Sequence, residues 1–592
     1  MANLVAPVNP LQPSVERIIE FKGLNRKQVV AEGEMSDMLN LTADNYPLLT
    51  QRKPRGVMRI PSEIIRPLQL MVKFEKIAMI AKTDESVYFY YDGNLIPNVT
   101  GLSESTTMVA INTKICFFPE KTYLEISPAG VPGEYGNLES EISVENLTVT
   151  INTADTRLVL SDDAGFRYGD AITITGQLTL RTGSTYTTVD VTASAPVEQW
   201  IEESNTLVIP QNTFLEAVGA DGVTLTGEIA RKMPDLDHVI EWNNRLWGAS
   251  NDTNTIYACK LGDPKNWQYY QGTGLDSYYA EQGTDGAFTG VATYSSHIIF
   301  LKQNSMCRIY GTAPSNFQMT NTDVFGCEIG SKRSVVTIND TVFWKSKIGI
   351  MAYNGGIPTC ISDNLNTEYL DAVAGTEKRK YYVSMHKRAG GYELLVFDTE
   401  KGFWHKEDNS RLRSCATIGD QLYSIEYDDE LMACSQNVIC SEWLLIGSDD
   451  ARAHVNVVNP TVPNEDINSM DWMAVFGPFD EYIEEHKIYS KLALRLVTDA
   501  SQDNTLVNES DETILTEMGE SLEIPRWVKV SISMDEGEWE QVELYEPPST
   551  KGDFIPIVPR RCDRYSIKVE GKGKCDIKSL TRRVRQGSFG RI

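Results

Sequence analysis

The sequence predicts an all-β protein: a β-propeller with an inserted β-domain and a C-terminal, β-sandwich-like platform domain. Three observations predict this class. Short runs of β-branched and aromatic residues alternate with polar residues and end at pairs of Asn, Asp, Gly and Ser, whereas helical stripes are scarce. An apolar strand end, a polar turn and a second apolar strand recur along the chain. The recurrence is interrupted once and stops at about Asn464.

The recurring unit is a predicted tight hairpin with polar residues at its turn. Clear copies lie at residues 111–115, 242–246, 294–298, 338–342 and 418–422, and weaker ones at 74–77 and around 385–394. With one exception, the copies are spaced by about the 40 to 50 residues of a four-stranded propeller blade. A closed ring of blades covers both faces of every blade, which one antiparallel sheet cannot do alone. The alternative is a series of unrelated hairpins in β-sandwiches.

The one long interval leaves about 80 to 90 residues beyond a single blade. Within it, residues 147–151, 171–175 and 186–192 alternate Thr with aliphatic residues. Such alternation places hydroxyl groups on one face of a strand and aliphatic side chains on the other, as in a small sandwich or barrel. We therefore expect an inserted β-domain here.

The sequence after about Asn464 changes to longer strands, such as 491–497 and 527–532, which predict a separate C-terminal β-platform. The interval between Arg495 and Arg526 is acidic and resembles a solvated loop, whereas the extreme C-terminus is basic. The predicted organisation is an N-terminal docking segment at 1–60, the first blades at 61–128, the inserted domain at 129–233, the remaining blades at 234–465 and the platform at 466–592.

The composition excludes several classes of protein. The 592 residues carry a formal net charge of -27, which disfavours nonspecific adhesion to nucleic acid or anionic membrane. The ten cysteines form no C-x-x-C pair, so we expect reduced core residues rather than a zinc site. Neither a secretion signal nor a run of 18 apolar residues occurs, which predicts synthesis in a reducing cytoplasm and no membrane span.

No residue pattern predicts a catalytic site, a cofactor or a metal. The six histidines are isolated, and no Walker loop, G-x-S-x-G elbow or dinucleotide fingerprint occurs. The segment 533–539 approximates the Ser-x-Asp-x-Gly-x-x-Trp turn of sialidase-like propellers, but it is one residue too short. We interpret it as a plain hairpin turn.

Two basic clusters are candidate subunit contacts, because Arg forms bidentate pairs at interfaces. For the first cluster the alternative is an exposed turn. For the second, docking on an acidic neighbour or simple solvation is favoured over contact with DNA. The candidates are Arg52, Lys53 and Arg55 in the first cluster and Arg582, Arg583 and Arg585 in the second.

Three segments carry motifs in a family-specific order. The first has a glycine-containing strand at 21–25, an Asn-Leu pair at 38–41 and an Arg-Pro element at 46–56. The second runs from 244 to 355 and includes the Gly-Asp-Pro-Lys-Asn-Trp turn at 262–267, and the third covers 567–580. In this order they resemble bacteriophage tail hub or nozzle proteins of the β-propeller type, the group of podovirus tail tubular protein B and packaged-DNA stabilisation proteins. Residues 129–233 have no counterpart in this resemblance.

The resemblance implies a structural virion protein rather than an enzyme. It implies a homohexameric ring on the tail axis below the portal and adaptor proteins, with attachment sites for fibres or spikes. The ring would retain the genome and let DNA leave without sequence-specific binding, in a virion assembled in the host cytoplasm. Two alternatives stay open. One is a carbohydrate-binding or glycan-cleaving propeller, suggested by 10 Trp and 26 Tyr, and the other is the distal baseplate hub of a long-tailed phage.

Overall fold

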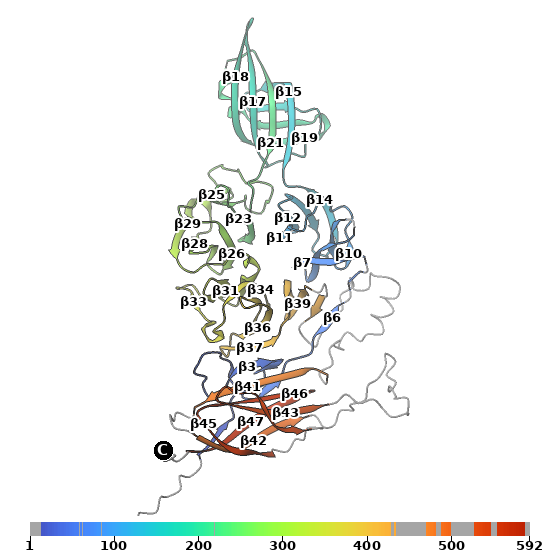
Figure 1. Cartoon of the computed structure of the whole chain (residues 1–592). Helices are drawn as coiled ribbons and strands as arrows, with labels where there is room; N and C mark the ends of the chain where they lie inside the picture. Colours follow the sequence, from blue (N-terminus) through green and yellow to red (C-terminus); the bar gives the residue numbers. More distant parts are fainter. Residues whose placement is uncertain are drawn as a thin grey trace, which may run out of the picture. The chain divides into compact units, whose positions relative to one another are not determined.

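The computed structural model describes residues 14–58, 60–61, 63–84, 86–217, 219–427, 431–433, 469–480, 487–498, 526–545 and 553–586. Nearly all elements in this part of the chain are β-strands, and six short 3₁₀ turns are the only helical elements described (Figure 1). None of these is long and apolar enough to cross a membrane. The chain divides into unit 1 (residues 1–61, 348–351 and 359–592) and unit 2 (62–347 and 352–358). The predicted all-β class is confirmed.

Unit 2 contains a succession of four-stranded antiparallel sheets. The strands are β7 (Arg66–Lys73), β8 (Lys76–Lys82), β9 (Val87–Tyr91) and β10 (Asn94–Leu95); β11 (Thr107–Ile111), β12 (Lys114–Phe118), β13 (Thr122–Ile126) and β14 (Pro132–Asn137); β22 (His238–Trp242), β23 (Arg245–Ser250), β24 (Thr255–Ala258) and β25 (Tyr278–Glu281); β26 (Phe288–Tyr294), β27 (His297–Lys302), β28 (Ser305–Tyr310) and β29 (Gln318–Asp323). A further sheet begins with β30 (Val336–Ile338) and β31 (Thr341–Ser346) and continues with β32 (Gly349–Tyr353) and β33 (Thr359–Cys360).

The sheets of unit 2 succeed one another through their first strands. β7 contacts β11, β11 contacts β22, β22 contacts β26, and β26 contacts β30. Consecutive propeller blades are arranged in this way around their axis. The predicted recurrence of four-stranded sheets is confirmed.

Apolar side chains fill the spaces between successive sheets of unit 2. The rings of Phe89 and Phe117 meet edge to face with their centroids 5.2 Å apart. The next space holds Phe118 and Trp267, and the one after it holds Trp247 and its neighbours. A strand with a neighbouring sheet on each face is buried on both faces, which explains why β27 is buried along its whole length.

The recurring hairpin is the turn between the first and second strands of each four-stranded sheet. In most copies one or both central residues have positive φ, as at Asn112 (48°), Asn243 (50°), Asn339 (51°) and Gly419 (57°). Two-residue hairpin turns need this left-handed region, which Asn and Gly tolerate, and the turn therefore leaves a signal in the composition. The predicted hairpins at 74–77, 111–115, 242–246, 294–298, 338–342 and 418–422 are confirmed.

The hairpin predicted around residues 385–394 is present, but it is not the equivalent turn of its sheet. The Gly-Gly turn there joins the second strand, β35 (Lys380–Lys387), to the third, β36 (Tyr392–Asp398). The equivalent turn lies between β34 (Tyr369–Glu377) and β35, where Lys378 has a φ of 53°. A lysine in the left-handed region leaves no compositional signal, whereas two glycines do, so composition alone points to the later hairpin.

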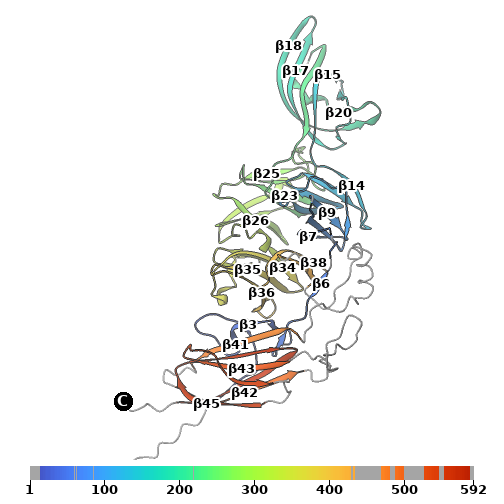
Figure 2. The same cartoon turned by 45° about the vertical axis from the view of Figure 1, so that its right-hand side comes forward.

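Residues 140–231 of unit 2 form a seven-stranded sheet, which we call the arm. Its strands are β15 (Ser140–Ile151), β16 (Asp155–Val159), β17 (Ala171–Thr182), β18 (Thr185–Pro196), β19 (Gln199–Ile201), β20 (Thr206–Pro210) and β21 (Gly222–Arg231), in the order β18-β17-β21-β15-β16-β20-β19. Three 3₁₀ turns accompany them: η1 (Glu202–Ser204), η2 (Gln211–Thr213) and η3 (Leu215–Ala217). The arm has a core of its own around Leu158, Ile174, Leu207 and Phe214. The β17–β18 hairpin extends beyond the other strands of this sheet (Figure 2).

Unit 1 contains two further four-stranded sheets. The first consists of β34, β35, β36 and β37 (Phe403–Asp408). The second consists of β38 (Leu412–Ile418), β39 (Gln421–Glu426), β40 (Leu431–Ala433) and β6 (Gly56–Met58). β6 precedes every other strand of the four-stranded sheets in the sequence, yet it pairs with β40 as the last strand of this one. The first strands β34 and β38 are again in contact.

Two six-stranded sheets complete unit 1. One has the order β4-β5-β47-β42-β45 with β1 paired to β47, and the other has the order β2-β3-β41-β46-β43-β44. The N-terminal strands are β1 (Ser14–Ile18), β2 (Gly23–Leu24), β3 (Glu34–Leu39), β4 (Leu41–Thr42) and β5 (Leu49–Gln51). The C-terminal strands are β41 (Asp471–Phe479), β42 (Lys487–Thr498), β43 (Trp527–Met534), β44 (Glu540–Tyr545), β45 (Asp553–Cys562), β46 (Tyr565–Lys572) and β47 (Cys575–Gln586). The sequence sets 1–60 apart as a docking segment, whereas in the structure its described residues supply strands to three sheets of unit 1.

Candidate functional site

The described histidines are built into the fold. His297 is buried, and Tyr353 Oη lies 2.8 Å from its Nε2 atom while Ser296 Oγ lies 3.0 Å from its Nδ1 atom. Burial lowers the pKa of His297 to about 4. His405 is also buried, its pKa is lowered to about 4 by burial, and its Nε2 atom accepts the backbone N–H of Ala43 at 3.2 Å. Both rings are therefore neutral at pH 7 and serve as hydrogen-bonding partners in the core.

The described residues contain no cluster of three or more His, Cys, Asp or Glu that could hold a metal ion. The sialidase-like segment 533–539 is a hairpin turn between β43 and β44, as interpreted from the sequence. Its carboxylate Asp535 accepts the backbone N–H groups of Asp563 and Arg564 at 2.8 and 3.0 Å. This acid braces a neighbouring loop and is thus committed to the fold.

The first predicted contact cluster is largely internal to unit 1. Arg55 is buried, and its Nη2 and Nη1 atoms lie 2.6 Å from Glu407 Oε2 and 2.6 Å from Asp408 Oδ2. Arg52 is buried beside it and donates from Nε to Asn40 Oδ1 at 2.7 Å. The paired acids end β37, so both guanidinium groups bind the edge of a sheet in their own unit. Lys53, between them, is exposed.

A third arginine extends this cluster. Arg26 donates from Nη1 and Nη2 to the two carboxylate oxygens of Glu393 at 2.9 and 3.0 Å, a bidentate pair. Tyr369 Oη donates to the same carboxylate at 2.8 Å. Burial alone would raise the pKa of Glu393, but the hydrogen bonds and charge of Arg26 outweigh burial and lower that pKa to about 2. We call Arg26, Arg52 and Arg55 with Glu393, Glu407 and Asp408 the N-terminal clamp.

The N-terminal clamp ties the segment that leads into β6 to the sheet β34–β37. Residues of the two partners are separated by more than 340 positions in the sequence. The sequence predicts Arg52 and Arg55 as a subunit contact or an exposed turn, whereas in the structure both bind groups of their own chain. Arg26 and Glu393 are not predicted from the sequence. Nothing in the local pattern distinguishes Glu393, at the second residue of a strand, from an exposed acid.

The second predicted contact cluster lies on β47. Arg582 is buried, with its guanidinium 3.8 Å from the ring centroid of Phe479 and its Nη2 atom 3.6 Å from Glu32 Oε1. Arg583 is half-buried. The backbone of Arg585 pairs with that of Ile488 in the sheet. Arg582 thus packs inside unit 1, and of the described side chains in this cluster Arg583 is the one that reaches the surface.

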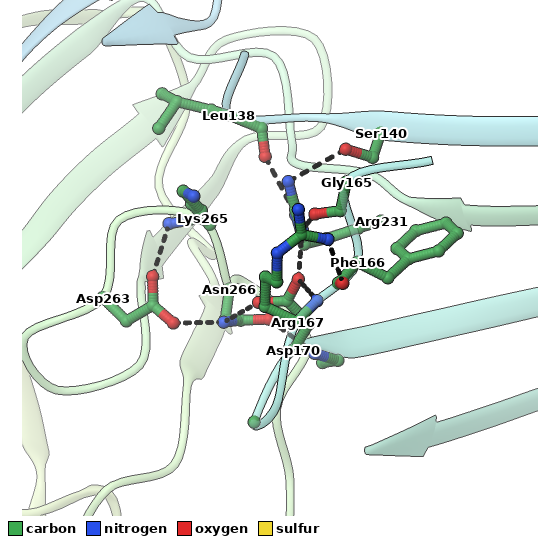
Figure 3. Close-up of polar contacts among 12 residues, drawn as sticks. Leu138, Ser140, Gly165, Phe166, Arg167, Asp170, Arg231, Asp263, Lys265 and Asn266 are labelled. Atoms are coloured by element: carbon green, nitrogen blue, oxygen red, sulfur yellow. Dashed lines mark hydrogen bonds and ion pairs between the residues drawn. The ribbon is translucent and has the colours of Figure 1, made fainter. Parts of the chain in front are cut away.

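A second buried network, at the base of the arm, is shown in Figure 3. Arg231, at the end of β21, and Asp170, just before β17, form a buried ion pair. The same guanidinium donates from Nη2 to Ser140 Oγ at 3.0 Å and from Nε to the carbonyl of Leu138 at 3.2 Å. Each guanidinium nitrogen of Arg231 therefore has a partner. Through these contacts the end of β21 is fixed to the start of β15 and to the residue just before β17.

The arm is joined to the loop between β24 and β25 by the buried side chain of Asn266. Its Oδ1 atom accepts the backbone N–H of Ala171 at 2.5 Å, and its Nδ2 atom donates to Asp170 at 3.4 Å. Lys260 Nζ donates to the carbonyl of Gly169 at 2.7 Å nearby. We call Arg231, Asp170 and Asn266 the arm junction.

The arm junction reuses a turn that the sequence singles out. In the Gly-Asp-Pro-Lys-Asn-Trp turn, Trp267 is buried, and its Nε1–H donates to the carbonyl of Pro264 at 2.8 Å. The preceding residue, Asn266, is then directed toward the arm (Figure 3). The sequence does not reveal the link of this turn to the arm, because Asp170 lies 96 positions away.

A cleft of about 620 Å³ lies within the arm itself. Its lining combines hydroxyl, amide and carboxylate groups with apolar residues, and includes Thr148, Thr150, Gln211, Asn212, Phe214 and Asp221. Asp221 Oδ2 accepts the backbone N–H of Gly183 at 2.6 Å and so links the cleft to the tip of the β17–β18 hairpin.

No family model and no curated protein matches the chain. Solved structures that resemble it include BamB from Moraxella catarrhalis, at 10% identity and a TM-score of 0.29, covering 62% of this chain and 93% of that one. The N-terminal domain of Nup159 gives 9% identity and a TM-score of 0.27, covering 65% and 96%. Hsv2 from Kluyveromyces lactis gives 10% identity and a TM-score of 0.26, covering 61% and 95%. Nothing about function follows from likenesses of this size.

Proposed function

We propose that the chain is a structural protein of a bacteriophage tail. In this proposal the four-stranded sheets close into a β-propeller, the arm is its inserted β-domain, and the two six-stranded sheets of unit 1 form a platform. Copies of the chain assemble into a ring on the tail axis, as a nozzle or hub that retains the genome and then guides it out. The ring sits against portal or adaptor proteins and carries fibres or spikes.

The observation that carries the proposal is the strand β6. A strand from the N-terminal segment completes the last four-stranded sheet, and the residues just before it supply strands to both six-stranded sheets. One continuous segment thereby fastens the last blade to the platform, and the buried clamp locks it in place. Such fastening suits a part that bears mechanical load during genome packaging and ejection. The sequence resemblance to tail hub and nozzle proteins supports the same role.

The charge of the chain supports a passive conduit. A ring of copies, each with a formal charge of -27, repels the phosphates of DNA, so the genome does not adhere to the wall while it leaves. The proposed mechanism is therefore mechanical: closure before ejection and a repelling lumen during it.

Cryo-electron microscopy of particles assembled from the genome that encodes this chain tests the proposal. We expect a ring of copies, six in the proposed assembly, on the tail axis, with DNA density above it before ejection. Mass spectrometry of the same particles should detect the chain in a fixed copy number relative to the portal. Absence of the chain from purified particles, or its presence only as isolated copies away from the axis, overturns the tail role.

A second candidate function is carbohydrate binding by the arm. The hydroxyl, amide and carboxylate groups that line the arm cleft are the groups that hold sugar hydroxyls. A glycan array probed with the full chain, followed by a hydrolysis assay on surface polysaccharide of the host, separates the two functions. Turnover, or binding that is lost in Asp221→Ala, favours this second function. A ring on the tail axis together with no glycan binding favours the tail role. If that ring lies at the distal end of a long tail, the chain is a baseplate hub.

A further inference from the structure

The strand β18 is an unusually long and unguarded sheet edge. It spans Thr185–Pro196 and lies at the end of the seven-stranded arm sheet, so only β17 pairs with it. Its sequence contains one charged residue, Asp190, and no lysine, and its single proline ends the strand. Sheet edges with unpaired N–H and C=O groups recruit further strands unless short length, charge, proline or a bulge prevents it.

Most outer edges of the other described sheets are guarded; the exception is β29 (Gln318–Asp323), which has six residues and a single acid at its end. β10, β33 and β6 have two or three residues each, and β25 has four. β14 contains a proline and two glycines, while β37 and β44 each carry two or more acids in six residues. β45 is long, but it contains two prolines and two arginines. β18 is the longest of these edges without an internal proline, and Asp190 is the one charged residue in its twelve positions.

The register of the hairpin identifies which backbone groups of β18 face outward. Residues Gly183 and Ser184 form a two-residue turn closed by the pair Thr182 and Thr185. Such a turn is closed by a hydrogen-bonded pair, and pairing then alternates along an antiparallel ladder. The N–H and C=O groups of the even-numbered residues, from Tyr186 to Ser194, therefore point away from β17. Pro196 is also even-numbered, so its backbone faces away from β17. This fits proline, which has no N–H to donate to the ladder with β17.

The outward edge is also accessible. Thr185, Tyr186, Thr187 and Thr188 are all exposed, and Tyr186 is 68% exposed. Nearer the end of the strand, β18 approaches β20 and η2, and the alternate side chains turn into the arm core. The accessible half of the edge is consequently the part next to the hairpin tip.

The net negative charge of the arm favours a positively charged partner. Residues 140–231 contain thirteen acids, four arginines and no lysine. Three of the four arginines are held in ion pairs within the arm: Arg157 with Asp155, Arg167 with Asp163, and Arg231 with Asp170. The arm as a whole is thus acidic and repels a second copy of itself, while the fourth arginine, Arg181, lies opposite Tyr186 next to the hairpin tip.

We propose that β18 binds an extended, Lys- or Arg-containing segment of a partner polypeptide by strand addition. The backbone of the segment pairs with the outward groups of Tyr186, Thr188 and Asp190, and its basic side chains lie against the acidic arm. Main-chain hydrogen bonds supply the affinity, and charge supplies the choice of partner. The inference does not depend on the tail role.

A peptide-display experiment on the full chain tests this inference. Random twelve-residue peptides are selected on wild-type protein and on two single variants, Thr188→Pro and Thr188→Ala. Proline at 188 removes an outward N–H and fits an edge strand, whereas alanine keeps that N–H. We expect enriched peptides that are rich in β-formers and carry Lys or Arg, that bind Thr188→Ala as they bind wild type, and that bind Thr188→Pro about tenfold more weakly.

Asp190→Lys is a third variant, at an exposed side chain. It should abolish binding of the basic peptides, because lysine on an edge strand opposes the addition of a further strand. Peptides that bind Thr188→Pro and Asp190→Lys as well as wild type overturn the proposal, as does selection of acidic peptides or of none. Light scattering of the chain without peptide provides a further check. Self-association that disappears in Thr188→Pro assigns the edge to a second copy and also overturns the proposal.

Discussion

The N-terminal clamp and the arm junction both centre on buried arginines, but they join the chain in different ways. In the clamp, three arginines of one segment meet three acids of a sheet far along the chain, so the link between the parts is itself ionic. In the arm junction, the ion pair of Arg231 and Asp170 lies inside the arm, and the link to the neighbouring loop is made by the neutral amide of Asn266. The comparison teaches that the clamp should respond to charge and pH, whereas attachment of the arm should respond mainly to the loss of a few hydrogen bonds.

The largest expected effect is that of Arg55→Ala in the clamp. The substitution leaves Glu407 buried without its principal cation, and truncating one partner of a buried ion pair costs about 3–5 kcal/mol. Calorimetric unfolding should show a lower transition temperature, and hydrogen exchange should accelerate in β37 and β6. Lys53→Ala is the matched control, because this exposed neighbour should change stability by about 0.5 kcal/mol or less. Equal effects of the two substitutions would contradict the assignment.

A comparable but local effect is expected of Arg231→Ala at the arm junction. Asp170 is then buried without a cation, which destabilises the arm by about 3 kcal/mol or more. Limited proteolysis should cut within residues 140–231 while the clamp strands keep their exchange protection. The double variant Arg231→Met with Asp170→Leu should recover much of the loss, because it removes both charges. Failure of the double variant to exceed the single one in stability would show that the hydrogen bonds, not the charges, hold this network.

The clamp should also weaken in acid. The pKa of Glu393 is lowered from its ordinary value of 4.5 to about 2, so its stabilising contribution is complete above pH 4.5 and is lost as the pH falls toward 2. Exchange protection of β36 and of residues around Arg26 should therefore fall across this range. Glu393→Gln should be less stable at pH 7 and should lose this part of the pH dependence. An unchanged acid profile in that variant would assign the dependence to other carboxylates.

The smallest effect is expected of Asn266→Ala. The change removes the acceptor for the backbone N–H of Ala171 and a donor to Asp170, and costs about 1–3 kcal/mol. The arm should keep its sheet, because its core and ion pair are untouched, but its attachment should loosen. A spin-label distance between the arm and β23 should broaden, whereas distances within the arm stay narrow. Thr173→Ala, which removes an exposed contact to Gln268, should leave both distributions as they are.

The sequence predicts those parts of the fold that depend on local chemistry. Asn112, Asn243, Asn339 and Gly419 mark hairpin turns because few residues tolerate the left-handed backbone those turns require. Trp267, which ends the Gly-Asp-Pro-Lys-Asn-Trp turn, is buried, as is typical of a large indole whose N–H finds a hydrogen-bond acceptor. The turn at Lys378 escapes detection because its residue type is common at many other positions.

The parts that escape prediction depend on partners distant in sequence. Arg52 and Arg55 are of a residue type that is common at interfaces. The residue type alone does not reveal whether the acid that binds each arginine lies in the same chain. Arg26 and Glu393 meet across 367 positions, and each resembles an exposed charge in its own neighbourhood. In the arm junction, the turn that carries Asn266 can be recognised in the sequence. Asp170, the carboxylate that accepts a hydrogen bond from Asn266, cannot.

The pairing of β1 with β47, in which Ser14 lies opposite Val584, has a consequence for biosynthesis. β1 is synthesised long before β47 and cannot pair with it until β47 is made, and β3 and β6 likewise pair with the distant strands β41 and β40. A prematurely terminated product is therefore left with unpaired N-terminal strands, a form that cellular quality control can recognise and remove.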